Sequence, residues 1–250
     1  MKASRLLSLP PYLFEDLENR YQRAVAGGRD VIDLSIGDPD LRPPASLTEN
    51  LRRALGNDSH HRYPPQRGDL LFKASIRRYL GRRCGIEPAD DQILILIGSK
   101  EGLAHLPWAV CNPGDTVIVP DPGYPVYHSS ATFAGCEVSP LGLSESNGFL
   151  PYPSQLSRAC ESGARLLILN YPNNPTSAAA EEDLFAGALE LSERYGVVVA
   201  NDAAYADIYT GDGATAVLCG QENALESRAI EFFSFSKRYS ITGWRVGFAV

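Results

Sequence analysis

The chain has 250 residues, with 23 lysines and arginines against 30 aspartates and glutamates, and a formal net charge of −7. This length allows one large domain or one domain with an appendage, and the negative charge disfavours nucleic acid or an anionic membrane as a partner. No apolar run approaches the ~20 residues of a membrane-spanning helix, and Pro10-Pro11 interrupts the short apolar N-terminus. A secretory leader is therefore not expected, and we predict a cytoplasmic protein.

Proline and glycine punctuate the first 45 residues. Between these breaks the sequence predicts one helix at residues 15–26, then an extended segment at 31–36 that enters a turn at Gly37-Asp38-Pro39. We interpret residues 1–45 as an N-terminal arm with part of a small domain, and residues 46–250 as the large domain.

Short apolar runs alternate with helical patterns through the rest of the chain. The runs lie at residues 92–97, 116–119, 137–140, 165–169, 197–200, 230–235 and 244–250, and clear helical patterns at 101–110 and 181–195. This alternation predicts an α/β fold with a mostly parallel, seven-stranded sheet flanked by helices. Residues 93–97 and 166–169 are apolar at every position, which is typical of strands buried on both faces. No helical pattern follows residues 244–250, so the last strand is expected to be exposed.

The five cysteines are odd in number and widely spaced, without a C-x-x-C pair. Such a set is typical of a reducing compartment, and it predicts buried thiols rather than a disulfide framework or a zinc site. The pair His60-His61 lacks the spacing of a metal-binding motif. No metal site is predicted.

The most informative segment contains Lys237, eight residues before Arg245. A lysine amine can condense with an aldehyde to form a Schiff base, and an arginine can grip a phosphate in bidentate fashion. Pyridoxal phosphate is the common cofactor that carries both groups. Ser234 and Ser236 precede the lysine and add hydroxyl groups. The alternative is a solvated face of basic residues after a strand.

Two earlier strand ends supply related features. Ser99 and Lys100 follow Gly98 at the start of a predicted helix, where backbone N–H groups can face an anion. Tyr124 is held in a Pro-Gly-Tyr-Pro turn, where its ring could stack on a flat heteroaromatic ring. An ordinary strand-to-helix turn and a surface tyrosine are the alternatives.

Two further strand ends supply polar groups for such a ring. Asn174 lies among three prolines and could donate to a phenolic oxygen. Asp202 ends an apolar strand, where an unpaired carboxylate is costly, and could keep a pyridine nitrogen protonated. Tyr205 could hydrogen-bond to the phenolic oxygen. The alternatives are a plain loop for Asn174 and a helix N-cap for Asp202.

Together these motifs resemble the fold-type I, class I and II aminotransferases that use pyridoxal phosphate, and among them the LL-diaminopimelate aminotransferases. The motifs that carry the resemblance are YLF at 12–14, IGDPD at 36–40, GSKEG at 98–102, PDPGYPVY at 120–127, NYPNNPT at 170–176, DAAY at 202–205, and SFSK with TGWRVGFAV within 234–250. They follow the family's order over nearly the whole chain.

The resemblance implies a role for each position. Lys237 would bind the cofactor covalently and move the substrate's Cα proton, Asp202 would pair with the pyridine nitrogen, and Asn174 and Tyr205 would bind the ring oxygen. The remaining implied contacts are stacking by Tyr124, phosphate binding by Ser99, Lys100, Ser234, Ser236 and Arg245, and substrate binding by Tyr12, Gly37, Lys100, Tyr124 and Asn174. Tyr63 would reach the cofactor of a neighbouring subunit, which implies a homodimer.

Two departures from the family accompany this resemblance. Ser177 stands where the family usually has glycine, which would strain a turn of positive φ. Family members also continue well past Val250, and the arginine that binds the substrate carboxylate would lie there. The expected activity is transamination between an L-amino acid such as LL-diaminopimelate and a 2-oxo acid such as 2-oxoglutarate, in lysine biosynthesis. A β-lyase or synthase on the same scaffold and an inactive, truncated product remain alternatives.

Overall fold

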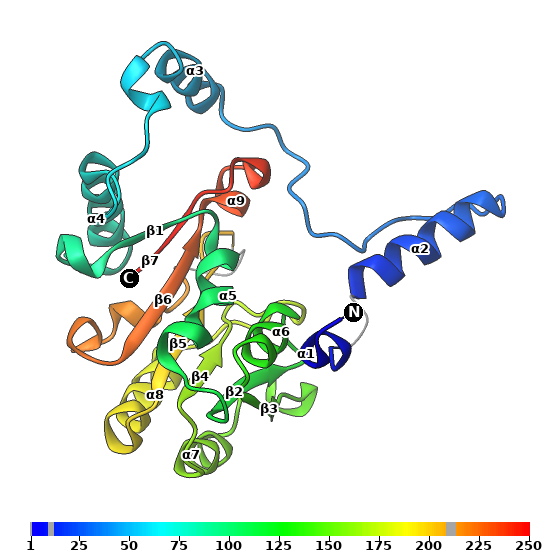
Figure 1. Ribbon diagram of the computed structural model, residues 1–250, viewed down its shortest axis with the longest axis vertical. Helices are drawn as coiled ribbons and strands as arrows, with labels where there is room; N and C mark the ends of the chain where they lie inside the picture. Colours follow the sequence, from blue (N-terminus) through cyan, green and yellow to red (C-terminus); the bar gives the residue numbers. More distant parts are fainter. Residues whose placement is uncertain (1, 10–12, 209–213) are drawn as a thin grey trace.

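The computed structural model describes residues 2–9, 13–208 and 214–250. Its centre is a seven-stranded sheet (Figure 1), formed by β1 (Leu94–Leu96), β2 (Thr116–Asp121), β3 (Glu137–Gly142), β4 (Leu166–Leu169), β5 (Val198–Asp202), β6 (Ala229–Ser234) and β7 (Gly247–Ala249). The strand order is β1-β7-β6-β5-β4-β2-β3. In this sheet, β7 pairs antiparallel with both β1 and β6, and all the other pairs are parallel. The predicted mostly parallel, seven-stranded α/β sheet is confirmed.

Helices cover both faces of the sheet. Their bounds are α4 (Leu70–Cys84), α5 (Ser99–Val110), α6 (Val126–Phe133), α7 (Pro153–Glu161), α8 (Glu182–Tyr195) and α9 (Phe235–Arg238). Short 3-10 turns lie at Asp58–His61, Asp90–Gln92, Glu145–Asn147, Leu218–Gly220, Ala224–Glu226 and Thr242–Trp244. The helices predicted at 101–110 and 181–195 are therefore α5 and α8.

Alternating side chains of β4 show why its sequence is apolar throughout. Leu167 packs in a core with α7 and α8, whereas Leu166 and Ile168 pack in a core with α5 and α6 on the opposite face. Successive side chains of a strand point to opposite faces, so a strand covered on both faces needs apolar residues at every position. A third core joins α4 to Phe233 and Phe248.

Two expectations about the sheet edges were wrong. In the run at 93–97, Leu94 and Ile97 are 58% and 69% exposed, whereas Ile93 and Leu96 are buried. The run forms β1, an edge strand, so it is not buried along its whole length. The last strand, β7, is not exposed. It pairs with β1 and β6, and Phe248 is completely buried. The early strand β1 takes the edge position that was expected for β7.

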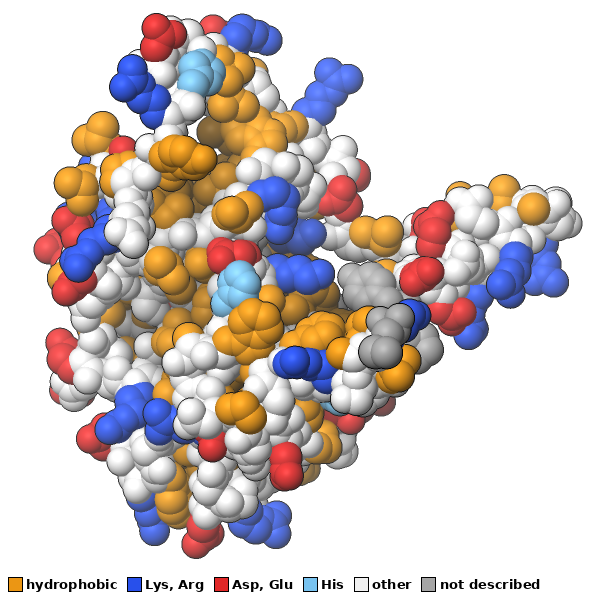
Figure 2. Space-filling model, in the orientation of Figure 1, with side chains coloured by type: hydrophobic (Ala, Val, Ile, Leu, Met, Phe, Trp, Pro, Cys, Tyr) orange, Lys and Arg blue, Asp and Glu red, His pale blue; other side chains and the backbone are white. Residues whose placement is uncertain are grey.

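The N-terminal residues stand apart from the sheet. Helix α2 (Leu13–Ala26) projects from the body of the molecule (Figure 1) and has no buried residue. In Figure 2 it forms an arm that carries both acidic and basic side chains. Before it, α1 (Ser4–Leu7) lies against α6, where Arg5 donates to the carbonyl oxygen of Phe133. After it, residues 27–44 form no helix or strand before α3 (Ala45–Ala54). The domain division at residue 45 stays a prediction.

All five cysteines are unpaired. Cys160 and Cys219 are buried, but Cys84, Cys111 and Cys136 are only half-buried, so the prediction of buried thiols was right for two of the five. Within residues 2–9, 13–208 and 214–250, no helix combines the length and the apolar character needed to cross a bilayer.

Candidate functional site

A cavity of about 460 Å³ opens at the carboxyl ends of the central strands. Most residues that the sequence nominated line it, namely Gly37, Ser99, Lys100, Tyr124, Asn174, Asp202, Tyr205, Ser234, Ser236, Lys237 and Arg245. Ligand sites in α/β folds with parallel strands form at this edge, because the loops that leave neighbouring strands meet there. Sequence positions up to 231 residues apart thus line one cavity, from Phe14 to Arg245.

The cavity also contains residues that the sequence analysis did not nominate, namely Phe14, Ser35, Ile36, Leu103, Ala204 and Thr242. Four of them, Phe14, Ile36, Ala204 and Thr242, lie within the recognised motifs. The N-terminal arm therefore contributes a wall of the cavity as well as the backbone of Gly37.

At one end of the cavity, Arg245 lies close to the N-terminus of α5. Gly98 has φ of +79°, and a Cβ there would collide with the guanidinium of Arg245. A Cβ at Gly247 would lie 2.7 Å from the backbone nitrogen of Ser99. These two glycines let Arg245 lie beside the N-terminus of α5, where the first backbone N–H groups have no partner within the helix. A guanidinium beside a helix N-terminus is a favourable site for a phosphate.

The Arg245 backbone is itself in the left-handed region, with φ of 53°. Its guanidinium donates to the carbonyl oxygen of Thr242 at 2.7 Å. Strained residues of this kind persist where the surrounding structure fixes them, often at functional sites. The conformation turns the chain between Thr242 and β7 so that the arginine faces the cavity.

Asp202 lies at the floor of the cavity and is only 5% exposed. Its carboxylate accepts hydrogen bonds from the Tyr127 hydroxyl at 2.8 Å and from the Ala204 backbone nitrogen at 3.2 Å. Burial raises the pKa of Asp202 to about 6, and the bond from Tyr127 opposes this rise. Both donors that the described residues supply are uncharged, so the carboxylate can still gain a cationic partner.

The N-cap alternative for Asp202 was wrong. The Ala204 bond closes a turn, and no helix begins among residues 203–208. Tyr127 was missed because its motif had drawn attention only to Tyr124. The signal was its spacing. Tyr127 lies three positions after Tyr124, one turn further along the chain at the start of α6, and the two rings meet edge-on at 5.9 Å.

Lys237 lies on α9, and its Nζ donates to the carbonyl oxygen of Gly37 at 3.0 Å. Burial lowers the pKa of Lys237, the positive charge of Arg245 lowers it further, and Asp38 raises it. Ser234 caps this short helix by accepting from the Ser236 backbone nitrogen at 3.2 Å. The lysine that was expected to act as a nucleophile thus has an environment that favours the neutral amine.

Asn170, which sequence reasoning did not single out, joins two of the loops. It is completely buried. Its side chain accepts from the Asn174 backbone nitrogen and donates to the Asp202 carbonyl oxygen, both at 2.8 Å. The buried amide of Asn170 therefore fixes the loop that contains Asn174 relative to Asp202. The same loop contains Ser177, whose φ of 62° has the sign that strains a residue other than glycine.

Three aromatic or cationic side chains complete the cavity. The Lys100 Nζ lies 5.5 Å from the centre of the Tyr124 ring. Burial raises the pKa of Tyr205, with Asp202 as a second cause, so its hydroxyl stays protonated at neutral pH. A protonated phenol can donate a hydrogen bond to an anionic oxygen.

Among the nominated residues that the structure describes, Tyr63 does not line the cavity. Tyr63 is fully exposed and lies between the turn at Asp58–His61 and α4. Its expected contact with a neighbouring subunit stays a prediction. Tyr12 lies outside the described residues.

Comparison with known proteins agrees with this geometry. The family described as aminotransferase class I and II matches residues 29–250. The LL-diaminopimelate aminotransferase of Syntrophobacter fumaroxidans is 43% identical over 251 aligned positions, which cover 100% of this chain and 64% of the relative. Substrate-bound BacF from Bacillus subtilis superposes with a TM-score of 0.89 at 33% identity, covering 100% of this chain and 63% of that one.

An aspartate aminotransferase from Rhizobium meliloti has a TM-score of 0.93 at 27% identity, with 100% of this chain and 62% of that chain covered. The chain therefore spans about 64% of the length of the curated relatives it matches. The likeness includes every strand and loop that forms the cavity.

Proposed function

Because the chain belongs to the class I and II aminotransferases, a family that depends on pyridoxal phosphate, we propose that the cavity binds this cofactor for transamination. The amino group would pass from an L-amino acid to a 2-oxo acid. The observation that carries the proposal is the convergence in one cavity of Lys237, the buried carboxylate of Asp202, and Arg245 beside a helix N-terminus.

The residues present fit the cofactor. Arg245, the N-terminus of α5, and the side chains of Ser99, Lys100, Ser234 and Ser236 would hold its phosphate. Asp202, which has only uncharged donors among the described residues, would pair with the pyridine nitrogen. Asn174 and Tyr205 would bind the ring oxygen, and Tyr124 would stack on the ring.

When bound, pyridoxal phosphate supplies an aldehyde that condenses with amines and a ring that accepts an electron pair. The chain's own residues handle the protons. The neutral Nζ of Lys237 would take the proton from the substrate Cα and deliver it to the carbon that the cofactor's aldehyde had supplied. Asp202, once ionised, would hold a proton on the pyridine nitrogen, and this cationic partner would lower the pKa of Asp202 below its value of about 6.

We propose LL-diaminopimelate or a similar amino acid as donor and 2-oxoglutarate as acceptor, which would place the protein in lysine biosynthesis. The support is the name of the relative that is 43% identical. Gly37 would meet the substrate through its backbone, with Tyr12, Lys100, Tyr124 and Asn174 around it. The arginine for the substrate carboxylate would belong to the part of the relatives that has no counterpart in this chain.

We also propose that the protein works in the cytoplasm as a homodimer. The support for the dimer is Tyr63, whose phenol is fully exposed and cannot serve the cavity of its own subunit from its position outside it. The five unpaired cysteines support a reducing compartment.

The test uses protein expressed from the full reading frame that contains this sequence, saturated with pyridoxal phosphate. One L-amino acid, added without a 2-oxo acid, should convert the cofactor stoichiometrically to its amine form, and 2-oxoglutarate should reverse the change. Release of pyruvate and ammonia instead would indicate a β-lyase. A panel of amino donors then identifies the substrate.

The lysine assignment has its own test. Borohydride reduction followed by peptide mapping should locate the cofactor on Lys237, and Lys237→Ala should abolish the labelling. Lys100→Ala is the control, because it removes an amine from the same cavity and should leave Lys237 labelled. Labelling of another lysine in the wild type would contradict the assignment.

A further inference from the structure

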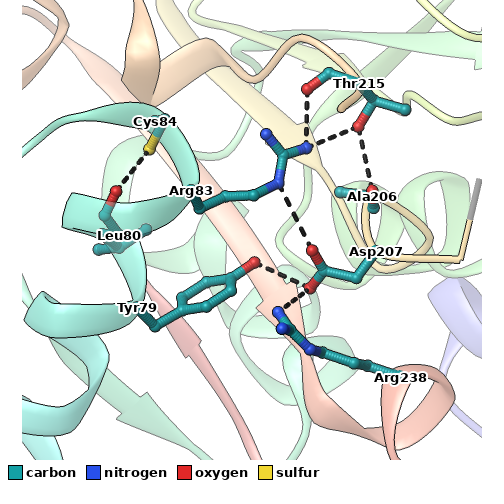
Figure 3. Close-up of polar contacts among 8 residues, drawn as sticks. All are labelled: Tyr79, Leu80, Arg83, Cys84, Ala206, Asp207, Thr215 and Arg238. Atoms are coloured by element: carbon teal, nitrogen blue, oxygen red, sulfur yellow. Dashed lines mark hydrogen bonds and ion pairs between the residues drawn. The ribbon is translucent and has the colours of Figure 1, made fainter. Parts of the chain in front are cut away.

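A cluster of charged side chains lies outside the cavity and is centred on Asp207 (Figure 3). Asp207 accepts a hydrogen bond from the Tyr79 hydroxyl at 2.8 Å and from Arg238 at 2.9 Å, and the Arg83 Nε lies 3.5 Å from its other oxygen. The side chains of Arg83, Asp207 and Arg238 are 11%, 18% and 32% exposed. We name these residues, with Thr215, the Asp207 cluster.

The cluster joins three parts of the chain that are distant in sequence. Tyr79 and Arg83 lie four residues apart on one face of α4, Asp207 follows β5, and Arg238 is the last residue of α9. Figure 3 shows Tyr79, Arg83 and Arg238 all pointing toward the Asp207 carboxylate. Asp207 thus connects the segment after β5 to α9.

This connection involves the two segments that carry the proposed chemistry. Asp207 lies five residues after Asp202 and two after Tyr205, and Arg238 directly follows Lys237. The contact between Asp207 and Arg238 therefore fixes the segment of Asp202 and Tyr205 relative to the helix that carries Lys237.

The helix α9 needs such support because it has only four residues. A single helical turn is not stable by itself, since its nucleation fixes several dihedral angles for one hydrogen bond. Its first end is capped by Ser234. Its last residue, Arg238, is held by Asp207 and also stacks on the Tyr79 ring, with its Cζ 4.8 Å from the ring centre.

The Asp207 side of the contact is equally fixed. Arg83 donates to the Thr215 carbonyl oxygen at 2.7 Å and to its hydroxyl oxygen at 2.8 Å. That hydroxyl donates in turn to the carbonyl oxygen of Ala206, the residue before Asp207. One phenol and two guanidinium groups thus surround the partly buried carboxylate and hold it in place.

We propose that Asp207 is a positioning residue for Lys237, which acts through Arg238 and sets the amine relative to Asp202 and Tyr205. This inference rests on the proposed function, because it concerns the lysine that would react. Asp207 itself does not line the cavity and is not a catalytic residue.

The test compares Asp207→Asn and Arg238→Gln with Thr215→Val, all in protein from the full reading frame. Asp207→Asn keeps the size of the side chain but removes the charge that holds Arg238. Arg238→Gln breaks the same contact from the other side, so one variant remains if the other does not fold. Thr215→Val removes two hydrogen bonds of the cluster and leaves the contact between Asp207 and Arg238 in place.

Three readouts separate positioning from general stability. For Asp207→Asn and Arg238→Gln, the covalent capture of pyridoxal phosphate by Lys237 should slow about tenfold, and kcat should fall about tenfold while KM changes less than about twofold. The visible circular dichroism of the bound cofactor, which reports its orientation, should also change. Arg238→Lys should restore part of each loss, because it returns the cation.

The control, Thr215→Val, should lower the melting temperature by a few degrees but leave all three readouts as in the wild type. Equal effects of Thr215→Val and Asp207→Asn on capture, or wild-type capture in both Asp207→Asn and Arg238→Gln, would overturn the positioning role while the proposed function stands. If the wild-type protein itself does not capture the cofactor at Lys237, the proposed function fails, and the inference with it.

Discussion

The Tyr127 hydroxyl donates a 2.8 Å hydrogen bond to the carboxylate of Asp202, and both side chains are buried below the cavity. This bond is one of the forces that oppose the rise in the pKa of Asp202 caused by burial. Asp202 in turn raises the pKa of Tyr127, after burial itself, because an ionised phenol beside a carboxylate would be strongly unfavourable. The pair is thus arranged as a protonated phenol that supports an ionised carboxylate.

Removal of the Tyr127 hydroxyl should lower the free energy of unfolding by an amount that depends on pH. In the cofactor-free protein, Tyr127→Phe should lower the free energy of unfolding by about 2–3 kcal/mol near pH 8, where the carboxylate is ionised, and by about 1 kcal/mol near pH 4.5. Urea unfolding at the two pH values measures the difference.

The matched control is Tyr171→Phe. Tyr171 is also buried, but its hydroxyl donates to the neutral carbonyl oxygen of Phe149 at 2.9 Å. Tyr171→Phe should lower the free energy of unfolding by about 1 kcal/mol at both pH values. A cost of Tyr127→Phe that does not change with pH would contradict the description of the pair.

Asp202 should destabilise the cofactor-free protein at neutral pH. The pKa is raised in the folded chain from its ordinary 3.8 to about 6. Well below pH 3.8 the group is protonated in both states and has no net effect. Between about pH 4 and pH 6 the unfolded state ionises while the folded state stays protonated, so the folded state loses up to about 3 kcal/mol relative to the unfolded state, and the loss is complete above about pH 6.

Asp202→Asn remains neutral at every pH. The cofactor-free variant should therefore match the wild type near pH 3 and exceed its unfolding free energy by up to about 3 kcal/mol near pH 8. Saturation with pyridoxal phosphate should stabilise the wild type more than the variant, since only the wild type offers a carboxylate to the pyridine nitrogen. Equal stabilisation by the cofactor would argue against that pairing.

The fold was largely predictable because each strand is a short apolar run between helical patterns. What the pattern could not show is which faces are covered. Leu94 and Leu166 look alike in sequence, yet Leu94 lies on an edge strand and Leu166 is completely buried. The position of β7 between β1 and β6 depends on long-range pairing, which composition does not encode.

For the site, the residues with unusual chemistry at strand ends could be nominated from the sequence, and the cavity gathers most of them. Supporting residues were missed for a physical reason. Asp207 and Arg238 are 31 positions apart and look like solvated surface charges when each is considered alone. Only the fold brings them together, so pairwise support of this kind is invisible in a single sequence.

Asp38 and Arg245 should shift the reactivity of Lys237 in opposite directions. Asp38 raises the pKa of Lys237 and Arg245 lowers it. Asp38→Asn should therefore move the pH midpoint of Schiff-base formation down, and Arg245→Gln should move it up, each by about a few tenths of a pH unit because exposed charges are screened. Condensation requires the neutral amine, so the rate rises with pH through this midpoint.

The measurement should use pyridoxal without its phosphate, so that loss of the phosphate-binding role of Arg245 does not interfere. Asp40→Asn is the control, since it removes an exposed carboxylate two residues from Asp38. A midpoint that moves as far in the control as in Asp38→Asn would show that the effect is not specific.

Replacement of Ser177 by glycine should stabilise the folded protein. Its φ of 62° places a residue with a Cβ in the left-handed region, which costs about 1–2 kcal/mol. Glycine removes this strain but adds about 0.5–1 kcal/mol of conformational entropy to the unfolded chain. Ser177→Gly should thus raise the unfolding free energy by about 0.5 kcal/mol, whereas Ser177→Ala, which keeps the Cβ, should give no gain in the same urea titration.

Tyr63 can be assigned to one subunit or the other by complementation. If its hydroxyl serves the neighbouring subunit, a heterodimer of Tyr63→Phe and Lys237→Ala has one site with both native residues. Unfolding and refolding the two inactive or impaired variants together in equal amounts should then recover about a quarter of the wild-type activity, because about half of the dimers are mixed. Lys237→Ala refolded with wild-type protein fixes the extent of subunit exchange. Activity that stays at the sum of the separate variants, under conditions where that exchange is complete, would mean that Tyr63 does not act across a dimer interface.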